Sequence, residues 1–295
     1  MASELPVDND GNRVVRIGHS PDPDDAFMFH AMTTGAFPTP GYNFVHELQD
    51  IETLNHRAIN CDLEVSAVSI HAYPEISADY ALMNCGASMG EGYGPMVVCK
   101  QGVSESEARA NVIAIPGLKT SAYLGIRICW GEIQYEVVPF DEIIPRIIDG
   151  TYLSGLIIHE GQLTYVDDDL KVLLDLGVWW NEKTGGLPMP LGGNVVRRDL
   201  GKQMMEDVTL YTKMSIEHSI RSPDIALEFA KQWGRGIDDK TNREFVQMYV
   251  NDRTIDYGAE GRESIRLFLK EGQKIGLINP EFDVDAIEFT GQPGE

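Results

Sequence analysis

The sequence predicts an α/β protein with two α/β lobes around a central cleft. Three observations lead to this fold class. The 295 residues are enough for two domains of ordinary size. Short apolar strands alternate with helical segments in two successive blocks, and this alternation is typical of α/β proteins. A composition of 43% hydrophobic and 24% charged residues is that of a globular chain.

The first block opens with an alternating strand, RVVRIG, followed by the loop HSPDPDD and the apolar run AFMFHAM. This run predicts a helix that Asp24 or Asp25 caps. Asp50 is the expected cap of a second helix, IETLNHRAI, and Ser69 opens a further helical turn. The strands of the block are expected at 13–18, 42–47, 63–68 and 95–99, and its helices at 26–32 and 51–59.

The second block repeats this alternation and is followed by helices alone. Its strands are expected at 112–115, 135–139, 154–158, 170–175 and 190–196, with helices at 120–130 and 141–149. Strands that alternate with helices favour largely parallel sheets. The helices of the tail are expected at 199–221, 223–233, 238–249 and 259–275.

Because the tail is polar, we expect it to pack onto the first block. The larger domain is then discontinuous, at 1–98 plus 199–295, and the smaller inserted domain is 99–198. Two crossings between such lobes enclose a cleft, which is the usual position of a small-molecule site. The carboxyl ends of parallel strands direct their loops toward a site of this kind.

Charge argues against a nucleic-acid partner. The net charge is −22, and a phosphate backbone would be repelled by such a surface. A small carboxylate ligand stays compatible with this charge if its site is built locally, from backbone N–H groups, a helix N-terminus or a few basic side chains. The sequence leaves a homodimer open.

The sequence shows no sign of export or of a membrane span. The N-terminal stretch MASELPVDNDGNRVVRIG has neither a basic nor an apolar region, so no signal peptide is expected. No apolar run is long enough for a bilayer, and a cytoplasmic location is predicted. The four cysteines form no CxxC pair, so reduced thiols are expected instead of a zinc site or a disulfide framework.

The loop HSPDPDD concentrates oxygen acceptors after the first strand. Its carboxylates suit a hard metal such as Mg²⁺ or Ca²⁺, but their spacing is not that of an EF-hand. The alternatives are a rigid loop whose Ser20 and Asp24 position a substrate, and ordinary turn and cap chemistry. We favour a cap combined with a substrate-lining loop.

The segment IPGLKTSAYLG reads as a strand, a tight turn and a helix. Thr120 and Ser121 lie at the helix N-terminus, where backbone N–H groups attract an anion and where Lys119 adds a positive charge. Thr120 is also a good cap for its own helix, and the residues alone leave both roles open.

Three other stretches carry weaker signals. The glycine cluster GASMGEGYG lacks the pattern of a nucleotide-binding loop, so it is interpreted as a loop near the ligand or the hinge. Trp179 and Trp180 suit a ring-binding pocket, although such pairs are more often packing residues. The stretch LPMPLGGN contributes Asn194 as a candidate substrate-binding residue.

The stretch SGLIIHEG places His159 at the end of an expected buried strand. Histidine titrates near neutral pH, so His159 is either a general base or a histidine with a purely structural role. The other histidines are too scattered in the sequence for a metal site.

These stretches together resemble a known family. HSPDPDDAF, DIETLN, PGLKTSAY, GLIIHE and the pair DLGVWW and GGLPMPLGG, in this order, resemble the 1,4-dihydroxy-6-naphthoate synthases of the futalosine route to menaquinone. The resemblance implies a periplasmic-binding-protein-like type II fold. It also implies a lyase that uses no cofactor and no metal and converts cyclic dehypoxanthinyl futalosine to 1,4-dihydroxy-6-naphthoate.

The resemblance also implies roles for single residues. His159 matches the proposed base, Thr120 and Ser121 match the carboxylate-binding position, and Ser69 matches another cleft residue. The family loop is often SPCPNDTF, whereas here Asp22, Asp24 and Ala26 replace Cys, Asn and Thr. We expect the substrate contacts of this chain to differ at that loop. Glu160 is expected to support the strand end.

Three alternatives to this lyase differ in testable features. A solute-binding protein on the same fold would need export, and no signal peptide is expected here. A chorismate dehydratase of the same pathway would lack the histidine of the IIHE motif. A metal enzyme centred on HSPDPDD would lose its activity with a chelator.

Overall fold

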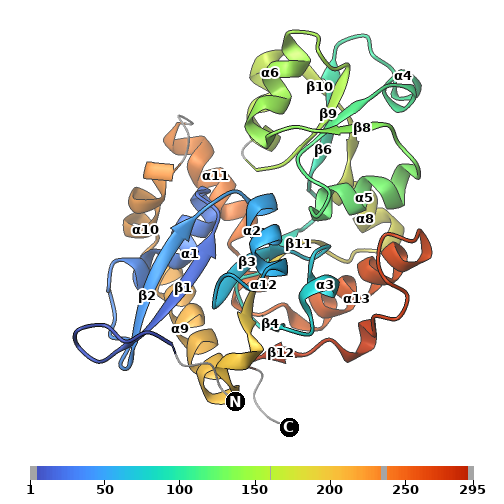
Figure 1. Cartoon of the computed structure of the whole chain (residues 1–295). Helices are drawn as coiled ribbons and strands as arrows, with labels where there is room; N and C mark the ends of the chain where they lie inside the picture. Colours follow the sequence, from blue (N-terminus) through green and yellow to red (C-terminus); the bar gives the residue numbers. More distant parts are fainter. Residues whose placement is uncertain (1–4, 160, 234–237, 292–295) are drawn as a thin grey trace. The chain divides into compact units, whose positions relative to one another are not determined.

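The structure is a computed structural model that describes residues 5–159, 161–233 and 238–291. Within these ranges the chain divides into two compact units. Unit 1 comprises 1–88, 192–258 and 285–295, and unit 2 comprises 89–191 and 259–284. Each unit contains one sheet covered by helices, so the predicted α/β class is confirmed (Figure 1).

The sheet of unit 1 has the strand order β12-β4-β11-β3-β1-β2, and β5 pairs with β11 beside this path. Its strands are β1 (Arg13–His19), β2 (Tyr42–Leu48), β3 (Val65–Ser69), β4 (Tyr80–Met83), β5 (Ser88–Gly90), β11 (Met189–Arg197) and β12 (Phe289–Thr290). Its helices are α1 (Pro23–Thr33), α2 (Ile51–Ile59), α3 (Tyr73–Ile76), α9 (Lys202–Arg221), α10 (Pro223–Ala230), α11 (Asp239–Tyr249) and α12 (Asp252–Ile255).

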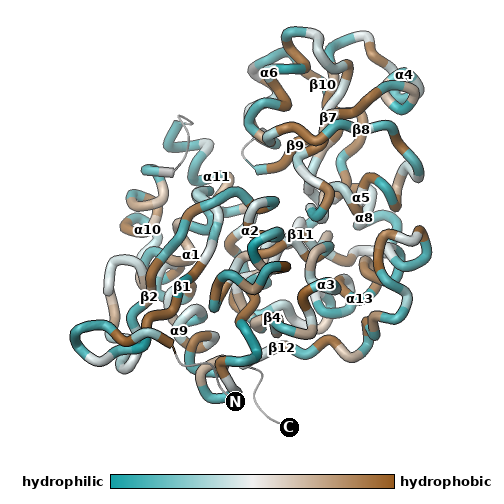
Figure 2. Tube along the Cα trace, in the orientation of Figure 1, coloured by the Kyte–Doolittle hydropathy of each residue, from teal (hydrophilic) through white to brown (hydrophobic). Residues whose placement is uncertain are grey.

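Helix α1 is central to the core of unit 1. It is apolar on nearly all sides, as expected for a helix enclosed by protein. One face packs with the strands through Met28 and Phe29, and others contact α9, α10 and α11. The Ser215 hydroxyl of α9 donates to the carbonyl of Met28 at 2.8 Å, which fixes the register of α9 against α1. Hydrophobic residues also run along β1 (Figure 2).

The sheet of unit 2 has the order β10-β6-β9-β7-β8. Its strands are β6 (Met96–Lys100), β7 (Ile113–Ile115), β8 (Tyr135–Val137), β9 (Ser154–Ile157) and β10 (Leu170–Asp175). Its helices are α4 (Glu105–Ala110), α5 (Ser121–Trp130), α6 (Ile143–Ile148), α7 (Gly161–Thr164), α8 (Leu176–Thr184) and α13 (Gly258–Lys274). Short 3-10 turns occur at Phe140–Glu142, Tyr165–Asp168, Arg198–Leu200, Lys231–Trp233 and Val284–Ala286.

The division of the chain differs from the expected one in its last third. The expectation placed all of 199–295 with the first block, whereas 259–284 groups with unit 2. The reason is a set of contacts between α13 and the rest of unit 2. Ser264 of α13 accepts a hydrogen bond from the indole of Trp180 in α8 at 2.9 Å and donates to the carbonyl of Pro188 at 2.6 Å. Phe268 adds an edge-on contact to the same indole.

The sheets are mixed, and the expectation of largely parallel sheets was wrong. Every antiparallel pairing with a defined register involves β6 or β11. These strands lie next to the points at 88/89 and 191/192 where the chain passes from one unit to the other. The alternation of strands and helices does not reveal such a change in strand direction, because both directions have the same apolar period.

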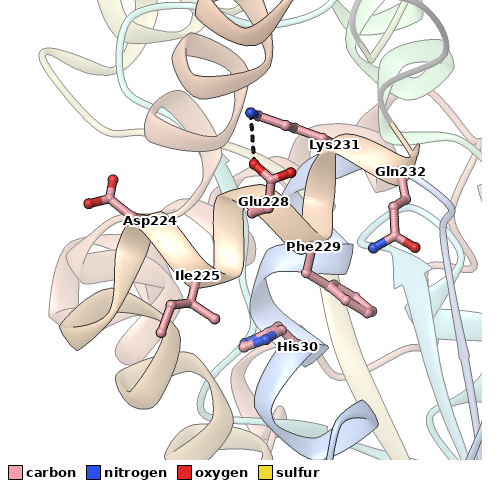
Figure 3. A pocket seen from close by; sticks show the side chains of 7 residues that line it. All are labelled: His30, Asp224, Ile225, Glu228, Phe229, Lys231 and Gln232. Carbon is pink, nitrogen blue, oxygen red and sulfur yellow. Dashed lines mark ion pairs between the residues drawn. The ribbon is translucent and has the colours of Figure 1, made fainter.

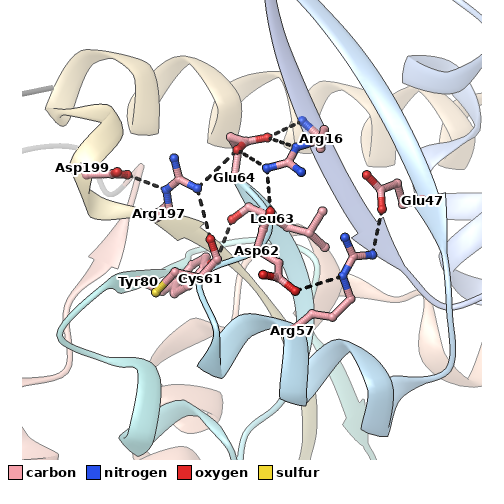
Figure 4. A network of polar contacts seen from close by, with 10 residues as sticks. All are labelled: Arg16, Glu47, Arg57, Cys61, Asp62, Leu63, Glu64, Tyr80, Arg197 and Asp199. Carbon is pink, nitrogen blue, oxygen red and sulfur yellow. Dashed lines mark hydrogen bonds and ion pairs between the residues drawn. The ribbon is translucent and has the colours of Figure 1, made fainter. Parts of the chain in front are cut away.

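A buried carboxylate connects β1, β3 and β11 (Figure 4). Glu64 is 3% exposed and accepts from the backbone N–H and the guanidinium of Arg16 at 2.9 Å, while Arg197 lies at 3.3 Å. Burial alone raises the pKa of Glu64, but the hydrogen bonds and charge of Arg16 outweigh it and hold the pKa below its usual value. Glu64 therefore stabilises the fold as an anion.

The helices of the described ranges include none with both the length and the hydrophobicity that a bilayer crossing requires.

Candidate functional site

The carboxyl edge of the unit 2 sheet brings together three predicted residues. Strands β7 and β9 are parallel neighbours, so the segments that follow them emerge at the same edge. Thr120 and Ser121 follow β7 after a turn, and His159 follows β9. The structure therefore groups, within one unit, the expected base and the expected carboxylate anchor.

His159 lies in a left-handed backbone conformation, with φ of +56°. Residues other than glycine rarely adopt this backbone conformation, and those that do often occur at functional sites. Its imidazole is half-buried and packs edge-on against Phe140, with 4.8 Å between ring centroids. The N–H of Gln162 donates to the carbonyl of His159 at 3.1 Å, which closes the turn into α7. Glu160 lies outside the described residues.

Thr120 caps α5. Its hydroxyl accepts from the N–H of Tyr123 at 3.1 Å and donates to the carbonyl of Gly117 at 2.9 Å. The hydroxyl of Ser121 donates to the carbonyl of Leu191 at 2.6 Å. Both hydroxyl protons thus go to the backbone. An anion at this end would meet the positive end of the helix dipole and the backbone N–H groups of the first turn.

The carboxyl edge of the unit 1 sheet carries the HSPDPDD loop, which follows β1. The backbone N–H of Ser20 donates to Asp25 at 2.7 Å, and the hydroxyl of Ser20 donates to Asp22. Ser20 and the three aspartates of the loop are nine-tenths buried or more. The loop is therefore fixed by hydrogen bonds within itself, as its prolines and acceptors led us to expect.

The start of helix α1 differs from the expected one. Its N-cap residue is Asp22, and the side chain of Asp22 makes no capping hydrogen bond. Asp24 and Asp25 lie in the first turn, so the expectation that one of them caps the helix was wrong. Asp24 instead accepts from the hydroxyl of Ser88 at 3.4 Å, and Asp25 binds Ser20. Pro23 at the first helical position starts the helix without a cap.

Ser69 ends β3, next to β1 in the sheet. Its N–H donates to the side-chain oxygen of Asn55 at 2.8 Å, and its hydroxyl lies 3.1 Å from the Asn55 amide nitrogen. Asn55 is fully buried in α2 and was missed as a positioning residue. Its signal was present: it ends the DIETLN motif, and an asparagine buried in a helix needs partners outside that helix.

Asn194 lies on β11, two residues beyond the partner of Ser69. Its amide donates to the carbonyl of Gly86 at 3.1 Å, and its side-chain oxygen is buried without a hydrogen-bond partner among the described residues. Gly86 has φ of +75°, and a Cβ there would lie 2.2 Å from the Asn194 amide nitrogen. Only glycine fits this approach. The Asn194 oxygen is an acceptor that a ligand donor could satisfy.

Two weaker interpretations also have an outcome. Trp180 is fully buried and bonded to Ser264, so it is a packing residue, as the alternative to a ring pocket anticipated. Backbone approaches the glycine-rich stretch closely: a Cβ on Gly90 would lie 1.9 Å from the carbonyl oxygen of Tyr93, and a Cβ on Gly94 would lie 2.8 Å from the backbone nitrogen of Gly177. Close approach of two backbones thus explains these glycines without a nucleotide.

A pocket of about 780 Å³ in unit 1 is lined by residues of α1, of α10 and of the 3-10 turn after α10 (Figure 3). Burial lowers the pKa of His30 at its floor, and Lys231 forms ion pairs with Glu228 and Asp239. None of the predicted site residues lines it. Its lining consists of His30, Asp224, Ile225, Glu228, Phe229, Lys231 and Gln232.

The aspartates of HSPDPDD form no metal centre in the described part of the chain. No group of three or more His, Cys, Asp or Glu side chains there is arranged to hold a metal ion. The carboxylates of Asp22 and Asp25 are engaged by Ser20.

Comparison with known proteins gives a family match over most of the chain. A family model described as menaquinone biosynthesis matches residues 15–274. The 1,4-dihydroxy-6-naphthoate synthase of Thermus thermophilus is 33% identical over 267 residues, which cover 90% of this chain and 96% of that protein.

Solved structures support the fold. A protein of Archaeoglobus fulgidus is 40% identical, with a TM-score of 0.86 over 90% of this chain and 98% of that one. The periplasmic aliphatic sulphonate binding protein of Escherichia coli is 9% identical, with a TM-score of 0.64 over 96% of this chain and 94% of that one. At that identity the likeness concerns the fold alone, and it confirms the expected periplasmic-binding-protein-like architecture.

Proposed function

Because the chain belongs to the 1,4-dihydroxy-6-naphthoate synthase family of menaquinone biosynthesis, we propose that it is a lyase that converts cyclic dehypoxanthinyl futalosine to 1,4-dihydroxy-6-naphthoate. One observation in the structure carries the proposal beyond the family name. His159 and the N-terminus of α5 emerge at the same edge of one sheet, from the parallel neighbours β9 and β7.

The proposed substrate carries a carboxylate. The first-turn N–H groups of α5, whose cap is Thr120, would hold this anion at the positive end of the helix. A local site of this kind is necessary because the chain as a whole carries a net charge of −22. Ser121 keeps the helix end in place through its bond to Leu191.

His159 is proposed as the general base. It would remove a proton from the bound substrate before a carbon–carbon bond breaks, and formation of an aromatic product drives that step. Phe140 covers one side of the imidazole and orients it. The proposal requires no cofactor, because a base and an anion anchor suffice for this chemistry.

The residues of the unit 1 edge are proposed as further substrate contacts: Ser20, Asp24, Ser69 and Asn194. The unpartnered oxygen of Asn194 is the strongest of these, since it would gain a hydrogen bond from a substrate hydroxyl. A cytoplasmic location and a homodimer both stay predictions.

The test is a direct assay. Purified, chelator-treated protein is incubated with cyclic dehypoxanthinyl futalosine, and 1,4-dihydroxy-6-naphthoate is measured by chromatography. Product formation in the wild type, and its loss in His159→Asn, supports the proposal. Binding without turnover would instead favour a carboxylate-binding protein, a function compatible with the fold shared with the sulphonate binding protein.

A further inference from the structure

Two histidines that the proposed reaction does not use lie at the first position of the HSPDPDD loop and on the strand beside it. His19 ends β1 and is 3% exposed, and His46 lies on the neighbouring strand β2. Nδ1 of His19 is 3.0 Å from the carbonyl oxygen of Ser20, and Nε2 of His19 is 3.1 Å from Nδ1 of His46. Phe29 stacks on the His19 ring at 4.6 Å and meets the His46 ring edge-on at 5.8 Å.

These contacts determine which nitrogens carry the protons. A carbonyl oxygen only accepts, so Nδ1 of His19 carries a proton and donates to Ser20. In a neutral imidazole Nε2 of His19 is then an acceptor, and Nδ1 of His46 donates to it. Nε2 of His46 is left with its lone pair, and this atom is buried without a hydrogen-bond partner in the described part of the chain.

The environment keeps both rings neutral. Burial lowers the pKa of His19 to about 4, against smaller opposing effects of the Ser20 carbonyl and the Asp22 charge. Burial, together with repulsion from His19, lowers the pKa of His46 to about 3. At neutral pH the direction of both hydrogen bonds is therefore fixed.

Ser20 is held at three atoms by this arrangement. Its carbonyl accepts from His19, its N–H donates to Asp25, and its hydroxyl donates to Asp22. If His46 cannot donate, no other hydrogen bond to Nε2 of His19 in the described part of the chain selects the tautomer that bonds Ser20. A free imidazole prefers the other tautomer, in which Nε2 carries the proton and Nδ1 would face the Ser20 carbonyl as a second acceptor.

We propose that His46 is a positioning residue: through His19 it holds Ser20, and with it the HSPDPDD loop, in the geometry that binds substrate. Its effect on catalysis rests on the proposed function, whereas its effect on Ser20 does not. His46 touches neither the base nor the loop hydroxyl, so its role is to fix the tautomer of His19.

The first test is nitrogen NMR of labelled protein at pH 7, with His19→Phe and His46→Phe used to assign the signals. Two neutral imidazoles protonated at Nδ1 are expected for His19 and His46. A His19 ring that is charged, or that carries its proton on Nε2, would overturn the proposal.

The second test uses matched variants of His46. His46→Phe keeps a flat ring but removes the donor, whereas His46→Asn places an amide donor near the position of Nδ1. We expect His46→Phe to speed amide hydrogen exchange of Ser20 about two- to tenfold, the range of one neutral hydrogen bond, and His46→Asn to restore most of the protection. His56→Phe is the control, because His56 is 60% exposed on α2 and bonded only within that helix.

The same variants are then assayed with substrate. His46→Phe should raise KM about two- to tenfold and change kcat by less than about twofold, with His46→Asn close to wild type. If His46→Asn behaves like His46→Phe, or if neither variant changes Ser20 exchange, His46 serves packing alone and the proposal fails. If the wild type has no turnover, the proposed function fails, and Ser20 exchange still decides the role of His46.

Discussion

The carboxyl edges of the two sheets differ in how their polar groups are used. At the unit 1 edge, Ser20 is held by Asp25 through its N–H and by Asp22 through its hydroxyl, and Asn55 binds both the N–H and the hydroxyl of Ser69. At the unit 2 edge, Thr120 caps the helix that begins there, and His159 has a left-handed backbone. The first edge is organised by side-chain hydrogen bonds to two serines, and the second by a helix cap and a residue in a rarely populated backbone conformation.

On the proposed function, this difference assigns substrate binding to the unit 1 edge and reaction to the unit 2 edge. The hydrogen bonds within the unit 1 edge already exist before a substrate binds, so binding does not have to order these side chains. Such a preorganised edge suits recognition of substrate shape. A histidine and a capped helix N-terminus at the same edge suit proton transfer and anion binding. The predictions below test whether the two edges separate in this way.

Removal of the base should have the largest effect. We expect His159→Asn to lower kcat about 100- to 10,000-fold, the usual contribution of a general base, with little change in melting temperature. His159 is half-buried at a strand end, so its loss creates no large core cavity. His56→Asn is the matched control, because the His56 side chain is exposed on α2. Turnover near that of the wild type would exclude His159 as the base.

Acid should destabilise unit 1 through its neutral histidines. The unfolded histidines bind protons below about pH 6.5, whereas folded His19 and His46 resist protonation down to about 4 and 3. Stability is therefore present above pH 6.5 and declines as the pH falls, by about 2.5 kcal/mol for each of the two histidines at pH 4.5. Urea unfolding from pH 7 to 4.5 measures this slope. His46→Phe should reduce it, and an equal slope in that variant would contradict the assignment.

Loss of the Ser69 partner should weaken the preorganised edge. Asn55→Ala leaves the buried N–H of Ser69 without its acceptor, at a cost of about 2 kcal/mol in the free energy of unfolding. We also expect KM to rise more than kcat falls. Asn60→Ala, at the exposed end of the same helix, is the control for unfolding experiments. Equal stability of the two variants would remove Asn55 as a positioning residue.

The sequence predicted the elements better than their grouping. Apolar period and caps located most of the strands and helices, because these signals are local, but they missed β4, β5, β12, α4 and α8. Asp50 caps α2 as expected, and Thr120 caps α5, which is one of the two roles that the sequence left open. Strand direction at β6 and β11 was not predictable, since it depends on which unit the chain has entered. The placement of α13 depends on Ser264 and its partners far away in the sequence.

For the candidate site, the sequence indicated the residue types and motifs but not the hydrogen-bond partners of the site residues. Ser20, Ser69 and Asn194 were predicted as ligand contacts, yet their partners Asp25, Asn55 and Gly86 follow only from the folded chain. The contact between His19 and His46 was invisible for the same reason, because the register of β1 against β2 creates it.

Substitution of the α5 cap should have the smallest effect on stability and gives the sharpest test of the unit 2 edge. Thr120→Ala removes the acceptor for the Tyr123 N–H, at a cost of about 1 kcal/mol, whereas Thr120→Ser retains it. If the helix end anchors the substrate carboxylate, the frayed first turn should raise KM severalfold in the alanine variant and leave kcat nearly unchanged. Steady-state kinetics alongside thermal unfolding separates the two effects. Lower stability with an unchanged KM would show that Thr120 serves its own helix alone, and the carboxylate would then require another anchor.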